Sequence, residues 1–187
     1  MGWTGVPGYR VTDKREYCRN LWNKDYVTII KDCMVGTTYY AAARKIAKTG
    51  YDENGNYTRL PLTESEQYVF AIVVKTDTYK GEFLYKEMDE TVGPCERNCP
   101  VSILKLLTAT DDKIAVEWRK ACWENARTPK LSSVKIGQKI KAKLFNGKEV
   151  VLLKHEPAYQ FKRPFWFSEE EGLYCKSNHI VSFSLVG

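Results

Sequence analysis

The pattern of the chain changes at one short segment, Arg127-Thr-Pro-Lys-Leu-Ser-Ser133, and this change constrains the fold more than any other feature. Before the segment, apolar stretches alternate with segments of helical periodicity, whereas only short strand-like runs follow it. The segment itself has the composition of a linker. We therefore predict two parts, an α+β domain at residues 1–129 and a small β-rich module at residues 130–187.

The first part has the pattern of an antiparallel sheet flanked by two or three helices. Its strand-like stretches are rich in β-branched and aromatic residues, and we place about four strands at residues 25–34, 37–43, 68–76 and 79–88. We expect residues 1–11 to run as an extended segment. Gly, Asp and Asn are concentrated at residues 50–56, which predicts a surface loop there.

Capping residues indicate where two of the helices begin. Thr12 or Asp13 can cap a helix that continues to about Trp22, because their side-chain oxygens accept hydrogen bonds from the first backbone N–H groups. Pro100 suits the first turn of a second, short helix, for which Asn98 is the candidate cap.

A longer helix is predicted before the linker. Asp111 or Asp112 can cap it, and the helical pattern continues to about residue 126. Ala115, Trp118 and Cys122 recur at spacings of three and four, which is typical of a stripe that packs into a core.

The second part consists of short strands only. Lys139, Lys141 and Lys143 alternate with apolar residues, so the three lysines share one face of a strand. Asn146-Gly147 is the clearest hairpin turn in the chain. Further strand-like runs follow at residues 150–153, 159–167, 173–176 and 180–186. About five short strands in so small a part predict a β-barrel of the SH3 or OB type.

The net charge of +6 is unevenly distributed along the chain. Between Lys130 and Arg163 there are nine Lys or Arg and two Glu, a net charge of +7 for that segment alone. A basic block on one part indicates a phosphate-bearing or acidic partner. Phenylalanine and tryptophan residues at 161–167 interleave with the last cations, and aromatic rings stack on bases while cations hold phosphates.

These observations define a candidate binding set for nucleic acid or another partner. Its members are Lys135, Lys139, Lys141, Lys143, Lys148, Lys154, Lys162, Arg163 and Trp166. The alternative interpretation is a solvated strand face above aromatic side chains that are buried in the module.

Cysteine spacing suggests a second kind of site. Cys95-x3-Cys99 and Cys175-x3-His179 could form a Cys3His zinc centre, although the same thiols could equally be reduced core or loop residues. The Pro-Cys at residues 94–95 resembles half of the zinc deaminase signature. The upstream His-x-Glu or Cys-x-Glu half of that signature is missing, which argues against a deaminase.

A cluster of carboxylates precedes this cysteine pair. Glu87, Asp89 and Glu90 could perform acid–base chemistry or hold a divalent cation, or they could be solvated and capping charges. No nucleophile or general base is recognisable beside them, and His155 and His179 stand in no triad context. We therefore expect a binding protein rather than an enzyme, without a cofactor, and keep zinc as the alternative.

Three motifs resemble a known group of proteins: the opening MGWT, the phrase YKEMDETVGPC with CPVSILKLL, and AVEWRKAC. They are similar to a family of uncharacterised small proteins encoded by bacteriophages and integrative conjugative elements. The resemblance covers Met1 to Cys122 with specific motifs and the tail more loosely. It implies an accessory protein of a mobile element, and it assigns no catalytic residue.

Proteins in that setting often neutralise host defences, including CRISPR and restriction nucleases, or handle the DNA of the element. The resemblance and the basic module together predict a protein that binds nucleic acid or a nucleic-acid-bound host defence protein. Two alternatives remain open. One is a zinc-stabilised or metal-dependent enzyme centred on the Cys95/Cys99 loop, and the other is direct inhibition of a host protein through residues 1–11 and the Gly93–Pro100 loop.

The expected location is the bacterial cytoplasm. No apolar run approaches the roughly 20 residues that span a bilayer, and the N-terminal segment lacks the apolar core of a secretory signal. We therefore expect no membrane partner and reduced thiols at all six cysteines.

Overall fold

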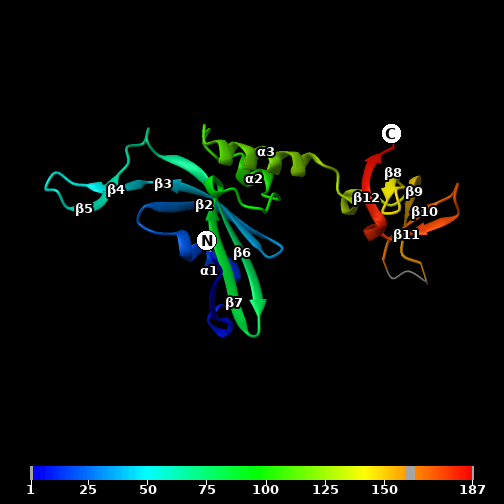
Figure 1. Ribbon diagram of the computed structural model, residues 1–187, viewed down its shortest axis with the longest axis horizontal. Helices are drawn as coiled ribbons and strands as arrows, with labels where there is room; N and C mark the ends of the chain where they lie inside the picture. The colour runs from blue at the N-terminus through cyan, green and yellow to red at the C-terminus, as the bar shows by residue number, and fades with distance from the viewer. Residues whose placement is uncertain (1, 159–162, 187) are drawn as a thin grey trace. The chain divides into compact units, whose positions relative to one another are not determined.

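The computed structural model describes residues 2–158 and 163–186, and it divides into two compact units, Met1–Arg127 and Thr128–Gly187. The division falls close to the predicted boundary at residue 129. Mostly antiparallel strands and few helices make up the chain (Figure 1), which confirms the prediction of a mixed α+β fold. None of the helices among the described residues is long and apolar enough to cross a membrane.

The first unit contains the helices and most of the strands. Its helices are α1 (Lys14–Trp22), α2 (Val101–Leu104) and α3 (Lys113–Arg127), with 3-10 turns η1 (Gly8–Arg10) and η2 (Glu90–Val92). Its strands are β1 (Thr4–Pro7), β2 (Val27–Val35), β3 (Thr38–Lys45), β4 (Ala47–Tyr51), β5 (Tyr57–Pro61), β6 (Tyr68–Tyr79) and β7 (Glu82–Asp89).

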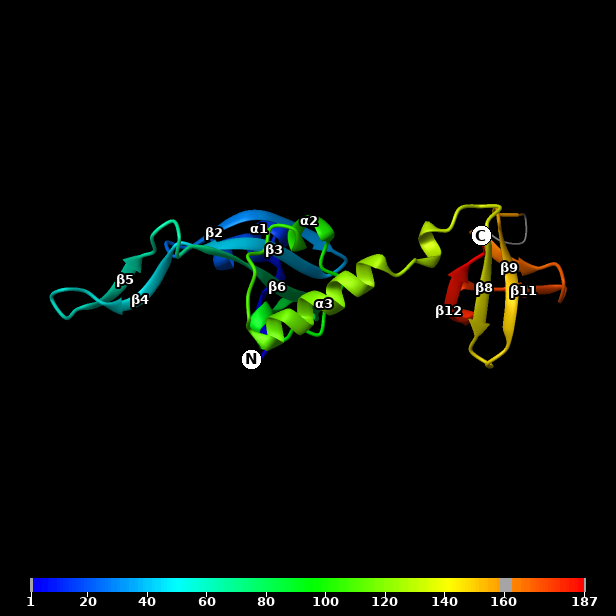
Figure 2. The same ribbon diagram turned by 90° about the horizontal axis from the view of Figure 1, so that it is seen from above.

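Five of these strands form one antiparallel sheet in the order β1-β7-β6-β3-β2. Its strand β3 is buried on both faces, because its residues alternate between two cores. Tyr40 and Ala42 pack with α2 and α3, whereas Tyr39, Ala41 and Ala43 pack on the face that α1 covers (Figures 1 and 2). The alanines leave room for helices on both sides of the same strand.

Two of the predicted caps are confirmed. Asp13 accepts hydrogen bonds from the backbone N–H groups of Arg15 and Glu16 at the start of α1. Asp112 accepts one from the N–H of Ala115 at the start of α3. The stripe of Ala115, Trp118 and Cys122 is buried, as its spacing predicts.

The prediction for Asn98 is wrong. No side chain caps α2, and the residue that precedes this helix is Pro100. Instead, the Asn98 side-chain oxygen accepts a hydrogen bond from the hydroxyl of Tyr40 on β3. Asn98 therefore ties the loop at residues 93–100 to the sheet, and this contact lies too far along the sequence for a local capping rule to reveal.

The sequence-based prediction also missed three strands. The extended N-terminal segment includes β1, which pairs with β7 and brings the sheet to five strands.

The other two missed strands flank the loop that was predicted at residues 50–56. The middle of that range is a loop in the structure, where Asp52 accepts hydrogen bonds from the N–H groups of Asn54 and Asn56. This loop joins β4 to β5 in a separate two-stranded sheet. The strands include Ala47, Lys48, Gly50 and Pro61, residue types that are depleted in strands, so their β signal is weak.

Gly8 is required for the close approach of the N-terminal segment to the turn between β6 and β7. Its N–H donates to the carbonyl oxygen of Gly81 at 2.8 Å, and a Cβ at Gly8 would lie 2.5 Å from that same oxygen. We expect Gly8→Ala to destabilise the first unit by about 1–3 kcal/mol, because the backbone must shift to relieve the overlap. Chemical denaturation would measure the loss. Gly2→Ala is the matched control, since a Cβ at Gly2 meets no atom within 4 Å among the described residues.

The second unit is one antiparallel sheet in the order β11-β10-β9-β8-β12. Its strands are β8 (Lys139–Leu144), β9 (Glu149–His155), β10 (Phe165–Ser168), β11 (Leu173–Cys175) and β12 (Ile180–Leu185), with 3-10 turns η3 (Leu131–Ser133) and η4 (Ser177–His179). Asn146-Gly147 connects β8 to β9, as predicted, and Gly147 has a φ of 83°. The described strands show a sheet around one core but no closed barrel.

Candidate functional site

Three lysines form a row on one face of β8. Lys139, Lys141 and Lys143 are exposed, whereas the intervening Ile140, Ala142 and Leu144 are buried in the core of the second unit. The predicted alternation is therefore confirmed. On the neighbouring β12, Ser184 and Ser182 lie opposite Lys141 and Lys143, so small hydroxyl side chains border the row on that side.

Aromatic side chains lie on the same face of the sheet, on the other side of the row. The strand registers place Lys139 opposite Leu153, Leu153 opposite Phe167, and Phe167 opposite Tyr174. Because residues directly opposite one another point to the same face, a lysine, a leucine and two aromatic rings form a continuous line across four strands.

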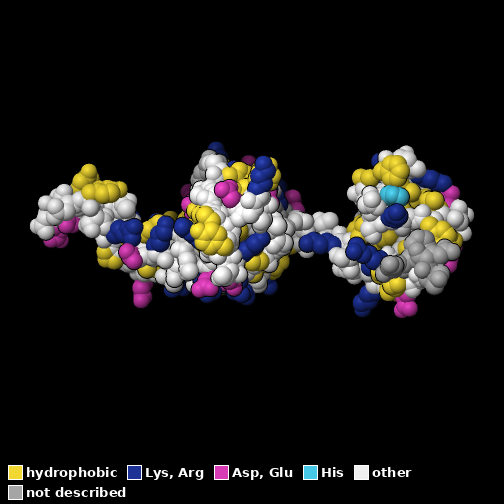
Figure 3. All heavy atoms as spheres, turned by 90° about the horizontal axis from the view of Figure 1, so that it is seen from below, with side chains coloured by type: hydrophobic (Ala, Val, Ile, Leu, Met, Phe, Trp, Pro, Cys, Tyr) yellow, Lys and Arg dark blue, Asp and Glu magenta, His cyan; other side chains and the backbone are white. Residues whose placement is uncertain are grey.

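The aromatic rings of this face contact one another. His155 stacks on Phe165 with ring centroids 5.3 Å apart and an interplanar angle of 9°, and the rings of Phe167 and Tyr174 are 4.8 Å apart. We call the whole surface the lysine–aromatic face; it comprises Lys139, Lys141, Lys143, Val151, Leu153, His155, Phe165, Phe167 and Tyr174. Figure 3 shows Lys and Arg side chains beside hydrophobic ones on the second unit.

A shallow hollow of about 180 Å³ lies within this face. Its lining residues are Lys139, Val151, Leu153, Phe167, Glu169 and Glu170. Lys139 forms an ion pair with Glu169 at 3.3 Å, and Lys141 forms one with Glu149 at 3.2 Å. All four side chains are more than half exposed, so such pairs contribute little stability and can exchange partners. The lysines are therefore accessible to an incoming anion.

Among the described residues, the other predicted cations lie outside this strand face. Lys154 is half-buried, and its ammonium donates to the carbonyl oxygens of Leu131 and Val134, so it holds the start of the unit against β9. Lys148 pairs with Glu171 beyond the end of β8. Lys135 and Arg163 are exposed outside the strands, and Lys162 lies outside the described residues.

Trp166 is a core residue rather than a binding residue. Its side chain is 1% exposed, its indole N–H donates to the hydroxyl of Ser177, and the ammonium of Lys154 lies 5.6 Å from its ring. The period of two along β10 sends Trp166 inward and its neighbours Phe165 and Phe167 outward. This corrects the prediction that Trp166 lies on the binding surface, because the side chain is enclosed in the core of the unit.

The predicted zinc ligands are divided between the two units. Cys95 and Cys99 belong to the first unit, where Cys95 is exposed and Cys99 is buried, whereas Cys175 and His179 belong to the second. Within the described ranges, no group of three or more His, Cys, Asp or Glu side chains could hold a metal ion. All six cysteines lie in these ranges, and none forms a disulfide.

Burial changes the chemistry of the thiols near the predicted zinc pair. It raises the pKa of Cys122 to about 11 and the pKa of Cys99 well above its ordinary value. Burial therefore disfavours the thiolate form of both side chains, which is the form that nucleophilic attack needs.

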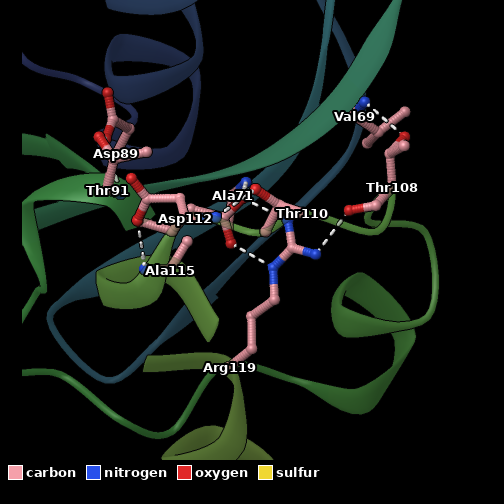
Figure 4. A network of polar contacts seen from close by, with 10 residues as sticks. Val69, Ala71, Asp89, Thr91, Thr108, Thr110, Asp112, Ala115 and Arg119 are labelled. Carbon is pink, nitrogen blue, oxygen red and sulfur yellow. Dashed lines mark hydrogen bonds and ion pairs between the residues drawn. The ribbon is translucent and has the colours of Figure 1, made fainter. Parts of the chain in front are cut away.

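Two members of the predicted carboxylate cluster make structural contacts. Glu90 is buried and accepts two hydrogen bonds from the guanidinium of Arg119, each 2.6 Å long. The third guanidinium nitrogen, Nη1, donates to the carbonyl oxygen of Thr108 (Figure 4). Asp89 accepts from the N–H of Thr91 and caps η2. Two of the three carboxylates are thus already committed to structural contacts.

Sequence reasoning missed His155 and Tyr174 as members of the lysine–aromatic face. Both positions follow from counting by twos across the paired strands, starting at Lys139. For Tyr174 that count needs the register of β10 and β11, which no turn signal as clear as Asn146-Gly147 fixes in the sequence. His155 lies on β9, which that turn pairs with β8, so counting by twos from Leu153 could have found it.

Comparisons with models of protein families, with curated proteins and with solved structures found no match to this chain. The site is therefore interpreted from its own geometry.

Proposed function

We propose that this chain is a non-enzymatic binding protein whose ligand is single-stranded nucleic acid, and that the lysine–aromatic face makes the contact. One observation carries the proposal: a row of three exposed lysines lies on the same sheet face as a group of aromatic rings.

The lysines of this face suit the phosphates of a single strand, and its aromatic rings suit the bases. Residues two apart on a β-strand are about 6.6 Å apart, so Lys139, Lys141 and Lys143 can follow successive phosphates of an extended backbone. Phe165, Phe167 and Tyr174 can stack on the unpaired bases, and each stacked base contributes about 1–3 kcal/mol. A duplex hides the faces of its bases, which favours a single strand.

The charge distribution supports the same proposal. The second unit contains ten Lys or Arg and five Glu, a net charge of +5, whereas the first contains nineteen Lys or Arg and eighteen Asp or Glu, a net charge of +1. A cationic unit attracts a polyanion from a distance and accelerates the encounter.

We also propose that the second unit is a small barrel of the SH3 or OB type. The strand order supports this, because the last strand, β12, returns to the free edge of the first strand, β8. Closure would then bring β11 and β12 together around the core that contains Trp166. Barrels of this size are common platforms for single strands and oligonucleotides.

The biological setting is the one that the sequence motifs imply. We propose an accessory protein of a phage or mobile element that acts in the cytoplasm of a bacterial host. Its nucleic-acid ligand would be free or held by a host defence protein, such as a CRISPR or restriction nuclease, and occupying that ligand would counteract the defence.

Reversing the charge of the lysine row tests the proposal. We expect the variant with Lys139→Glu, Lys141→Glu and Lys143→Glu to lose at least about 100-fold in affinity for a fluorescent single-stranded oligonucleotide, measured by anisotropy at low salt. The affinity of the wild type should fall steeply as salt rises, because binding releases counterions. Replacing the same lysines by Gln adds no repulsion and should give an intermediate loss.

The matched control reverses three exposed lysines of the first unit, Lys31, Lys105 and Lys120. It changes the net charge by the same amount and should leave the affinity within about threefold of the wild type. Thermal melting would show that all variants are folded. Equal losses in the two triple variants, or no binding by the wild type, would reject the lysine–aromatic face as the site.

A further inference from the structure

The hairpin of β4 and β5 projects from the end of β3 as a sheet of only two strands (Figures 1 and 2). Among the described strands, none pairs with the outer edge of either β4 or β5. Isolated two-stranded hairpins are marginally stable in water. A hairpin of this kind is more stable when its face is covered.

Two tyrosines stand together at the tip of this hairpin. Tyr51 and Tyr57 face each other across the strands, with ring centroids 5.3 Å apart, and they are 71% and 67% exposed. Aromatic side chains dominate the energetic centres of protein interfaces, because they bury a large area at a small cost in conformational entropy. Figure 3 shows hydrophobic side chains gathered at this end of the molecule.

Charges of opposite sign separate along the same hairpin. The tip loop contains Asp52 and Glu53, whereas Lys45, Lys48 and Arg59 lie toward the base. Arg59 pairs there with Asp25 and Lys48 with Glu66, but these pairs are exposed and can exchange partners. Hydrogen bonding by the backbone N–H of Asn56 holds the pKa of Asp52 below its ordinary value, so the tip is negative at neutral pH. Figure 3 shows Asp or Glu side chains at the tip, and Lys or Arg side chains together with further acidic ones nearer the base.

The base contains a hollow of about 280 Å³ whose lining residues are Tyr26, Lys45, Ala47, Thr49 and Arg59. Lys45 and Arg59 lie over the ring of Tyr26, at 4.6 Å and 4.3 Å from its centroid. Thr49 and Arg59 are opposite each other, two residues from Tyr51 and Tyr57 respectively, so the hollow and the tyrosine pair are on one face of the hairpin.

We propose that this hairpin face is a self-complementary contact through which two copies of the chain associate. About a twofold axis, the hairpins lie face to face and antiparallel. The acidic, aromatic tip of each then reaches the cationic hollow at the base of the other. Both tips then occupy a hollow at the same time. Two copies therefore use up the contact surfaces, and no further copy can add through them.

The proposed contact between the two hairpins is small and charged. Each hairpin contributes two strands of five residues, so the buried area falls at the small end of the range for specific interfaces. We infer a weak, reversible dimer, which rising salt weakens by screening the charges. This association does not depend on the proposed binding of nucleic acid.

A charge-swap experiment tests this arrangement, with sedimentation velocity over a range of protein concentrations as the readout. Glu53→Lys and Arg59→Glu should each weaken the dimer at least about tenfold. In either variant, the tip of one copy and the base of the other carry charges of the same sign, and this repulsion occurs twice in the symmetric dimer. The double variant Glu53→Lys/Arg59→Glu restores opposite charges and should regain most of the association. Tyr51→Ser/Tyr57→Ser should leave the protein monomeric.

Two exposed residues outside the hairpin provide matched controls. Tyr79→Ser and Glu64→Lys remove an exposed tyrosine and reverse an exposed acid, and both variants should dimerise like the wild type. A wild type that stays monomeric at several hundred micromolar, or a double variant as weak as the single ones, would overturn the proposal. So would hairpin variants that lower oligonucleotide affinity without any change in association, because the hairpin would then be a nucleic-acid contact.

Discussion

Arg119→Met should destabilise the first unit by about 3–5 kcal/mol, the usual cost of leaving a buried carboxylate without its cationic partner. The side chain of Glu90 is 2% exposed, and Arg119 supplies two hydrogen bonds and the only cation that pairs with it among the described residues. In the variant, Glu90 would retain only the N–H of Ala71, which donates to it at 3.3 Å. Guanidinium denaturation followed by tryptophan fluorescence would measure the loss.

A second substitution distinguishes the missing charge from the missing packing. Adding Glu90→Gln to Arg119→Met removes the unpaired charge and keeps an oxygen that can accept from Ala71. This double variant should recover more than half of the lost stability, because a neutral amide costs less to bury than a carboxylate. Arg44→Met, at an exposed position on β3, is the control and should change stability by less than about 0.5 kcal/mol. An Arg119→Met variant as stable as this control would contradict the assignment.

The Glu90–Arg119 pair also illustrates why part of the first unit could not be predicted. Local rules found Asp13, Asp112 and the stripe on α3, because a cap or a helical stripe involves residues a few positions apart. Glu90 and Arg119 are 29 residues apart, and nothing near either one indicates the other. The contact exists only after α3 has packed on the sheet.

In the second unit, the sequence predicted the row of lysines and pointed to the aromatic residues at 161–167, but it did not show which of these rings are exposed. Lysines alternate with apolar residues around Lys141, and the structure confirms this local pattern. A strand with one apolar face buries that face and leaves the other exposed. Along β10, apolar side chains occupy both faces, so composition alone cannot tell which of them are buried. Pairing of Phe167 with Leu153 settles that point, and it places Trp166 inside.

Asp32 should make the stability of the first unit sensitive to acid. This carboxylate on β2 is buried and accepts hydrogen bonds from Arg15 and Arg19 of α1, each at 2.8 Å. Burial alone would raise its pKa, but the hydrogen bonds and charges of the two arginines outweigh burial and hold the pKa below its ordinary value. The stabilisation is therefore present above the unfolded pKa of about 3.9 and is lost as the pH falls through the lower, folded pKa.

Comparing Asp32→Asn with the wild type at several pH values measures this contribution. At pH 7 the variant should be less stable by about 1–3 kcal/mol, because asparagine keeps the shape but not the charge that the arginines bind. The difference should shrink below about pH 4 and vanish once the wild-type carboxylate is protonated. Asp25→Asn removes a carboxylate that is 92% exposed beside Arg59, and this control should change stability by less than about 1 kcal/mol at every pH. A difference for Asp32→Asn that persisted unchanged into strong acid would mean that position 32 stabilises the sheet through packing, and that the two arginines of α1 are held by other contacts.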